Sequence, residues 1–264
     1  GLILSGYVAF SLNQGWRASF VVMGAGTLVV AAALWLLVRE RPPHEEDGGR
    51  ETPAGVRSTP LRSEAERVGG KLLSRDLMLV YAAGFCSLYG FFVVITWLPY
   101  YLHVARGVPV AQTGIIASFV PWASLPGALL LSHLSDRWRR RRALALAMLP
   151  AAALAFVAIP LAGSTLALYA ALVAYGFVGK LALDPILVAY VADRVPKTAY
   201  SRAYALLNFS GMLSSILAPI VTGALADRTG SLDAGFYLAT GLLLVGTLCM
   251  ALTRPEHPRS GDRN

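Results

Sequence analysis

Long runs without charged side chains alternate with short polar connections along most of the chain. Six such runs contain no Asp, Glu, Lys or Arg, and they cover residues 18–38, 77–102, 107–135, 143–179, 203–226 and 234–253. All but one have 20 to 29 residues, which matches the roughly 20 residues that an α-helix needs to cross the apolar core of a bilayer. The pattern therefore predicts several membrane-spanning segments.

The run 143–179 has 37 residues and is too long for one crossing. Pro160-Leu-Ala-Gly-Ser-Thr165 in its middle predicts a turn between two spans. An apolar stretch at 1–10 is too short to cross, and we interpret it as the end of a truncated helix. Seven full spans are thus expected near 18–38, 77–102, 110–133, 143–160, 165–192, 203–226 and 234–253. Because lipid offers no hydrogen bonds to the backbone, the expected fold is an all-α polytopic membrane protein.

Composition agrees with a membrane protein and narrows the chemistry. Of 264 residues, 56% are hydrophobic and 14% are charged, against about 25% charged in ordinary soluble domains. Cys86 and Cys249 lie far apart in apolar runs, and the four histidines lack ligand spacing. We therefore expect no disulfide, no metal site and no cofactor. Gly176-Phe-Val-Gly179-Lys180 lacks the spacing of a P-loop, and no other motif indicates an enzyme.

The distribution of positive charge predicts the orientation of the spans. Of 23 Lys and Arg, 19 fall in connections on one side of the membrane, three on the other, and Lys180 lies inside a span. By the positive-inside rule the first side is cytoplasmic, together with the C-terminus. The net charge of +8 is explained by this asymmetry, so no nucleic-acid partner is expected.

Four regions follow from these spans. Residues 1–38 would be the end of one bundle, and 76–253 would be a complete six-helix bundle. Between them, 39–75 reads as a hydrophilic cytoplasmic linker with eight basic and seven acidic side chains, and 254–264 as a cytoplasmic tail. A partner-binding role for the linker is the alternative.

Two short strings indicate that the six-helix bundle is an inverted repeat of three helices. Ser132-His-Leu-Ser-Asp136-Arg137 closes one span on the cytoplasmic side, and Gly223-Ala-Leu-Ala-Asp227-Arg228 closes another on the outside. Each has a small residue four positions before Asp-Arg, at opposite faces of the membrane. Two three-helix units inserted in opposite senses would place them so.

These features resemble the major facilitator superfamily, specifically its C-terminal half with the sixth helix. Gly15-Trp16-Arg17 opens a span that ends in Arg39-Glu-Arg-Pro42, as the sixth helix does, and the long linker falls where that family joins its two bundles. Residues 132–141 resemble the loop motif G-x-x-x-D-R-x-G-R-R, with Ser132 and Arg139 in place of its glycines. The resemblance implies one full and one partial helix of an N-terminal bundle, followed by the complete C-terminal bundle.

Two stretches are most similar to the anion:cation symporter branch. They are Trp97-Leu-Pro-Tyr-Tyr-Leu102 and Asn208-Phe-Ser-Gly-Met-Leu-Ser-Ser-Ile-Leu-Ala-Pro219. Met212 stands where that branch often has a second Asn in N-F-x-G-N. The resemblance implies secondary active transport of a small, anionic solute by alternating access, coupled to a cation, which we expect to be the proton. A drug or metabolite exporter of the same superfamily is the first alternative, and a membrane receptor or assembly protein that transports nothing is the second.

Lys180 and Asp184 are the main candidates for binding. A charge at the centre of a membrane helix costs about 2.5 to 3.5 kcal/mol, and residues four apart on a helix can pair. Either this helix face lines the transport cavity, with Lys180 attracting the anion and Asp184 neutralising Lys180 or exchanging a proton, or the pair only ties two helices together. Pro185 weakens the helix one turn back, near Leu181.

Weaker candidates lie on neighbouring helices. Tyr89 and Asn208 would hydrogen-bond the solute if their helices line the cavity, and each could instead contact another helix. A conformational latch is expected from Asp136, Arg137, Arg140 and Arg141, and from Asp227 and Arg228 at the other face, with membrane anchoring as the alternative for the basic residues. The expected partners are a small-molecule solute, a proton and the lipid bilayer, and the expected location is the plasma membrane, as a monomer at full length.

Overall fold

The computed structural model describes residues 15–37, 72–138 and 140–254 and divides the chain into two units, Gly1–Val68 and Gly69–Asn264. In the first unit the described part is one helix, α2 (Gly15–Leu37). Its exposed side chains are almost all apolar, including Phe20, Leu28 and Trp35. The apolar stretch 1–10, most of the linker and nearly all of the tail lie outside the described residues.

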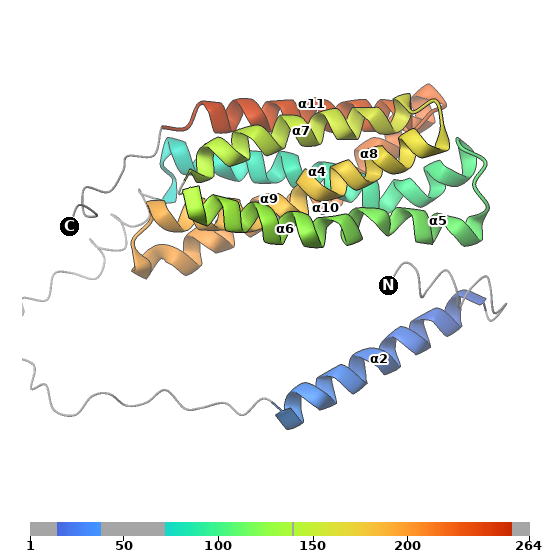
Figure 1. Cartoon of the computed structure of the whole chain (residues 1–264), viewed down its shortest axis with the longest axis horizontal. Coiled ribbons are helices and arrows are strands. Elements are labelled where there is room, and N and C mark those ends of the chain that lie inside the picture. The colour runs from blue at the N-terminus through green and yellow to red at the C-terminus, as the bar shows by residue number, and fades with distance from the viewer. Residues whose placement is uncertain (1–14, 38–71, 139, 255–264) are drawn as a thin grey trace, which may run out of the picture. The chain divides into compact units, whose positions relative to one another are not determined.

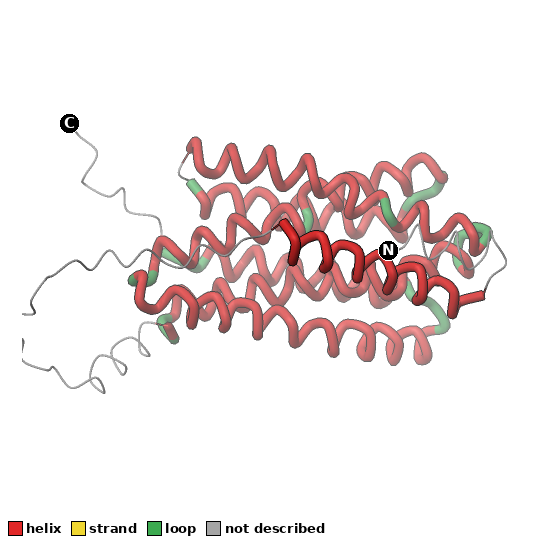
Figure 2. Tube along the Cα trace, turned by 90° about the horizontal axis from the view of Figure 1, so that it is seen from below, coloured by secondary structure: helices red, strands yellow, loops and turns green. Residues whose placement is uncertain are grey.

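The second unit is a bundle of helices joined by short turns (Figure 2). In chain order they are α4 (Arg75–Val104), α5 (Val110–Ala117), α6 (Phe119–Trp138), α7 (Arg141–Leu161), α8 (Thr165–Val178), α9 (Lys180–Arg194), α10 (Tyr200–Thr229) and α11 (Asp233–Ala251). A 3-10 turn, Lys197–Ala199, precedes α10. Residues 15–37, 72–138 and 140–254 contain no strand, so the predicted all-α class is confirmed.

Seven segments within the described ranges are long and apolar enough to cross a membrane. They are α2, α4, α5 with α6, α7, α8 with α9, the 3-10 turn with α10, and α11. These segments coincide with the seven full spans predicted from the sequence, with ends shifted by a few residues. The chain is therefore a multi-pass membrane protein.

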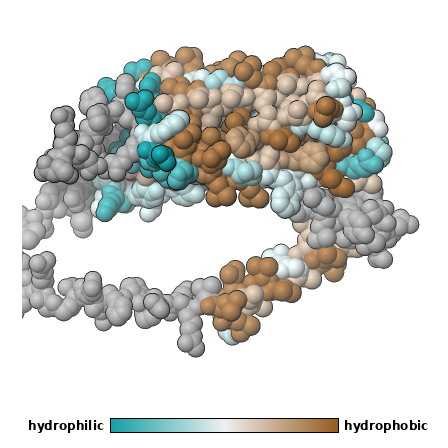
Figure 3. All heavy atoms as spheres, in the orientation of Figure 1, coloured by the Kyte–Doolittle hydropathy of each residue, from teal (hydrophilic) through white to brown (hydrophobic). Residues whose placement is uncertain are grey.

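Successive spans of the bundle run in opposite directions (Figure 1). α4 and the α8–α9 segment run in opposite senses, as expected for two inverted units of three spans. The α6–α7 and α9–α10 connections lie at the same end as the start of α4 and the end of α11. Figure 3 shows hydrophilic residues gathered at the ends of this bundle and apolar residues along its length.

Glycines set the approach of α4 to α10 at the bundle centre. A Cβ built on Gly84 of α4 would lie 3.1 Å from Leu207 of α10, and one on Gly211 of α10 would lie 3.0 Å from Leu88 of α4. Each helix thus places a leucine over the other's glycine, an arrangement that lets membrane helices pack closely without a hydrophobic driving force.

α6 and α8 cross even more closely. A Cβ on Gly127 of α6 would collide with the carbonyl of Phe177, and one on Gly176 of α8 would collide with the carbonyl of Val120. The two backbones therefore touch, and glycine is required on both sides of the crossing. This crossing fixes the end of α8, the point at which the span is interrupted.

Two spans that the sequence predicted as single helices are each divided in two. The span expected at 110–133 breaks at Ser118, between α5 and α6. Pro121 explains this break, because a proline nitrogen cannot donate a hydrogen bond to the carbonyl of Ala117. The span expected at 165–192 breaks at Gly179, between α8 and α9.

Candidate functional site

The break at Gly179 places a new helix start inside a membrane span. Gly179 is extended, with φ −75° and ψ −163°, and Lys180 is the first residue of α9. A Cβ at Gly179 would collide with the carbonyl of Tyr175 one turn back. Only glycine allows the chain to pass this close to α8 before α9 begins.

Lys180 and Asp184 form an ion pair at the start of α9. The Lys180 Nζ lies 2.9 Å from an Asp184 carboxylate oxygen, as the spacing of four residues predicts. The Lys180 side chain is 16% exposed and the Asp184 side chain 44% exposed. The pair therefore opens toward a surface instead of being sealed among helices.

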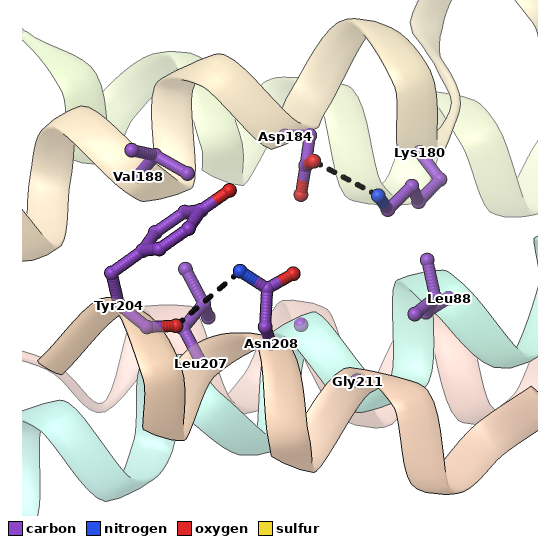
Figure 4. A pocket seen from close by; sticks show the side chains of 9 residues that line it. Leu88, Lys180, Asp184, Val188, Tyr204, Leu207, Asn208 and Gly211 are labelled. Atoms are coloured by element: carbon purple, nitrogen blue, oxygen red, sulfur yellow. Dashed lines mark hydrogen bonds and ion pairs between the residues drawn. The ribbon is translucent and has the colours of Figure 1, made fainter. Parts of the chain in front are cut away.

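That surface is a small pocket between α9, α10 and α4 (Figure 4). Its polar members are Lys180 and Asp184 on one wall and Asn208 and Tyr204 on the facing wall. The remaining lining residues are small or apolar: Gly84, Leu88, Val188, Leu207 and Gly211. Three of the four residues predicted to bind the solute thus meet in one pocket.

Asn208 points from α10 toward α9 in Figure 4. Its side-chain amide donates a long hydrogen bond of 3.4 Å to the carbonyl of Tyr204 on the same helix. Such a contact is weak, so the amide is available for a stronger partner in the pocket.

Tyr89, the fourth predicted residue, does not line the pocket. It is 2% exposed and packs against Phe85, with ring centroids 6.3 Å apart. Its hydroxyl is buried, as is the Thr222 hydroxyl of α10. In this structure Tyr89 is an aromatic packed inside the bundle, the alternative considered for it above.

Tyr204 is a pocket residue that was not predicted from the sequence. It lies one turn before Asn208 on α10, and its side chain is 45% exposed. The spacing of four residues, which puts both side chains on one helix face, was the available signal.

Arg141 ties three helix ends together at the basic end of the bundle. One guanidinium nitrogen lies 2.8 Å from Asp193 of α9 and donates to the carbonyl of Ala189, while the other lies 3.4 Å from Asp136 of α6. Two of the predicted latch residues, Asp136 and Arg141, are therefore paired. Asp193 is a third member of this cluster. It was not predicted, because a charged residue at the end of a membrane helix is common and carries no further signal in the sequence.

The other predicted latch residues behave differently. Within 15–37, 72–138 and 140–254, Arg137, Arg140, Asp227 and Arg228 form no ion pair. Asp227 and Arg228 do lie at the opposite end of the bundle, where α10 ends at a left-handed Gly230 with φ 72°.

A second set of contacts fastens the last turn of α9 to the end of α11. The Tyr190 hydroxyl donates a hydrogen bond of 3.0 Å to the Thr253 hydroxyl. Arg142 of α7 also donates to the Thr253 hydroxyl, at 3.1 Å, and to the carbonyl of Ala251, at 2.8 Å. Arg194 lies 3.7 Å from the Tyr190 ring centre and donates to the carbonyl of residue 254. This end of α9 is held from two neighbouring helices.

The described residues contain no group of three or more His, Cys, Asp or Glu side chains that could hold a metal ion. The chemistry of the pocket is thus that of one ammonium, one carboxylate, one amide and one phenol. These groups can bind and release a small polar ion, and none is arranged as a nucleophile with its base.

The family model described as Major Facilitator Superfamily matches residues 1–179 and 80–264 of the chain. Three curated relatives, each 28% identical, illustrate what the chain is similar to. They are the "Probable sulfoacetate transporter SauU" of Cupriavidus necator (255 residues aligned, 91% of this chain, 58% of the relative), the "Probable galactarate/D-glucarate transporter GudP" of Bacillus subtilis (249 residues, 87% and 54%) and an "MFS-type efflux pump" of Mycolicibacterium smegmatis (279 residues, 98% and 60%). The chain spans little more than half the length of these relatives.

Solved structures show the same fold at low sequence identity. The Escherichia coli fucose:proton symporter FucP aligns with a TM-score of 0.65 at 13% identity, covering 91% of this chain and 58% of FucP. The POT family transporter PepTSo aligns with a TM-score of 0.60 at 17% identity, covering 72% of this chain and 40% of PepTSo.

Proposed function

Because the chain belongs to the major facilitator superfamily, we propose that it supplies one six-helix bundle of a secondary active transporter for a small organic anion. The relatives are transporters and not enzymes. Residues 76–253 are this bundle, 1–38 the end of a companion bundle, and 39–75 and 254–264 cytoplasmic segments. The two bundles alternate access to a site near the middle of the membrane.

The observation that carries this proposal is the Lys180–Asp184 pair in an open pocket. Charged residues inside membrane spans are costly and mark solute and ion pathways. A pair that only held helices together would be expected to join two of them, whereas both charges here lie on α9 and face the pocket. The relatives named for sulfoacetate and for galactarate or D-glucarate support an anionic solute.

Exchange of partners at Lys180 couples the anion to a proton. In the empty site Asp184 neutralises Lys180. When one acid group of the solute pairs with the Lys180 ammonium, the Asp184 carboxylate takes up a proton, which balances the negative charge of that acid group. Asn208 then turns its amide from the weak contact with Tyr204 to the solute.

The contacts of Arg141 with Asp136 and Asp193 stabilise one of the two conformers, as a latch at the cytoplasmic end. The asymmetry of positive charge between the two sides of the membrane supports a cytoplasmic linker and C-terminus, with the protein in the plasma membrane. The transporter acts as a monomer, and its partners are the solute, the proton and the surrounding lipid.

The test measures whether candidate solutes raise the melting temperature of the purified full-length protein. A ligand that binds the folded state raises its melting temperature. Small carboxylates and sulfonates are expected to stabilise the wild type but not Lys180→Gln. Lys197→Gln is the matched control, because Lys197 is exposed in the turn before α10 and does not line the pocket. Equal stabilisation of wild type and Lys180→Gln by the same anion would overturn the assignment.

Export of apolar compounds is the second candidate. It is favoured by the relative named as an efflux pump and by the apolar pocket wall of Leu88, Val188 and Leu207. Hydrophobic cations in the same panel decide between the two, since an exporter would be stabilised by them and by no small anion.

A further inference from the structure

Tyr204 is the one polar pocket residue whose functional group is left without a partner. Lys180 and Asp184 neutralise each other, and Asn208 donates to a backbone carbonyl. Over the described parts of the chain, the Tyr204 hydroxyl makes no hydrogen bond to another residue. A phenol can both donate and accept a hydrogen bond, so this group is free to act on whatever enters the pocket.

The position of Tyr204 directs its hydroxyl into the pocket. In Figure 4 its ring reaches from α10 toward α9, and the hydroxyl points into the space near Val188 and Asp184. The Lys180 ammonium lies on the far side of Asp184 in the same view. The pocket therefore has a cationic end at Lys180 and a neutral, hydrogen-bonding end at Tyr204.

This polarity favours solutes with two different ends. A short monocarboxylate held at Lys180 has no group left to contact the phenol. A longer anion with hydroxyl groups along its chain presents hydrogen-bonding groups to Tyr204 while its acid group stays on Lys180. Sites that hydrogen-bond a hydroxyl discriminate strongly against analogues that lack it, because the polar group of the site is then left unpaired.

We infer that Tyr204 is a specificity-determining residue that selects hydroxylated organic anions over unsubstituted anions of the same length and charge. This inference rests on the proposed function, since it takes an anion bound at Lys180 as its starting point. Lys180 attracts the acid group of any such anion, and the Tyr204 hydroxyl favours those anions that carry hydroxyl groups.

The chain contains a close control for this role. Tyr200 is also on α10, one turn earlier, and its side chain is 42% exposed compared with 45% for Tyr204. Tyr200 does not line the pocket. If α10 carries these tyrosines only because aromatic rings favour the membrane interface, removal of either hydroxyl must have the same effect.

The experiment compares tartrate with succinate, two four-carbon dicarboxylates that differ in their hydroxyl groups. Dissociation constants are measured on the native-length protein for wild type, Tyr204→Phe and Tyr200→Phe. The wild type is expected to bind tartrate more tightly. Tyr204→Phe is expected to weaken tartrate binding about fivefold to tenfold, the usual effect of one lost hydrogen bond, and to leave succinate binding within about twofold. Tyr200→Phe should change neither, and all three proteins should fold, because each substitution removes one oxygen atom.

Three other results would overturn the inference. If Tyr204→Phe weakens both anions equally, the phenol has no role in selection, and anion binding itself still stands. If both tyrosine variants match the wild type, the hydroxyl does not contact the solute. If neither dicarboxylate nor any other small anion stabilises the wild type, the inference and the proposed function fail together.

Discussion

The two halves of α9 carry polar residues that are satisfied in opposite ways. In the first half, Lys180 and Asp184 contact each other and open to a pocket. In the second half, the carbonyl of Ala189, the Tyr190 hydroxyl and Asp193 are each bonded to another helix or its end. The first half of α9 thus carries groups that are available to a ligand, and the second half carries groups that hold the helix in place.

This difference shows how a membrane helix can both bind and anchor. A polar group bonded to a neighbouring helix cannot move to a ligand without leaving its partner on that helix unpaired. A pair formed within one helix can exchange a member for a ligand without disturbing the packing. The break at Gly179 separates the binding half from α8, while the arginines fix the other half.

The largest effect is expected at the break itself. Gly179→Ala places a Cβ against the carbonyl of Tyr175, so the start of α9 must shift, at a cost of about 3 kcal/mol in unfolding free energy. Gly241→Ala on α11 is the control, because a Cβ there has nothing within 4 Å. Thermal melts should separate the two variants clearly. Equal melting temperatures would show that the break does not depend on glycine.

Removal of the central anchor should cost somewhat less. Arg141→Gln leaves Asp193 and the carbonyl of Ala189 without their partner, and we expect a loss of about 1.5 kcal/mol, because the Asp193 carboxylate is half-exposed and water replaces part of the lost interaction. Arg140→Gln removes an exposed neighbouring charge without an ion pair in the described ranges and should stay within about 0.5 kcal/mol of wild type. Chemical or thermal unfolding measures both, and a similar loss in the two variants would contradict the anchoring role.

A smaller loss is expected where α9 meets α11. Thr253→Val keeps the shape of the side chain but removes the hydroxyl that accepts from Tyr190 and Arg142. One lost network of this kind costs about 1 kcal/mol. The melting temperature should fall while anion affinity stays unchanged, and a fall in affinity at constant stability would place this end of α9 in the binding site.

The smallest effect has the opposite sign. Asp184→Asn removes the competitor for Lys180, so anion affinity should rise about threefold, in line with the modest strength of part-exposed ion pairs. Asp193→Asn is the matched control and should lower stability without raising affinity. Titration calorimetry on both variants provides the comparison, and weaker binding by Asp184→Asn would mean that the carboxylate contacts the solute directly.

The spans could be predicted from the sequence because an apolar run of about 20 residues without charge is typical of a helix that crosses a membrane. The sequence placed the weak point of the 165–192 span near Leu181 from Pro185 alone, and the break lies at Gly179. The exact position depends on the contact between α6 and α8 at Gly127 and Gly176, which no local pattern contains.

The pocket brings together the residues predicted on α9 and α10 but not Tyr89, the residue predicted on α4. Tyr89 is buried inside the bundle and packs against Phe85, one turn earlier on the same helix. The pocket is lined instead by Gly84 and Leu88, each one position earlier. A shift of one residue rotates a helix by about 100°, and the rotation is set by packing between helices, here by Gly84 against Leu207.

A double-mutant cycle at Lys180 and Asp184 tests most directly that the pair is a binding site and not a structural tie. Stability and anion-induced stabilisation are measured for Lys180→Gln, Asp184→Asn and the double variant. We predict that the double variant, which contains no unpaired charge, melts close to wild type and no longer responds to any anion. If it keeps the wild-type response to anions, the pair does not bind them and the account is wrong.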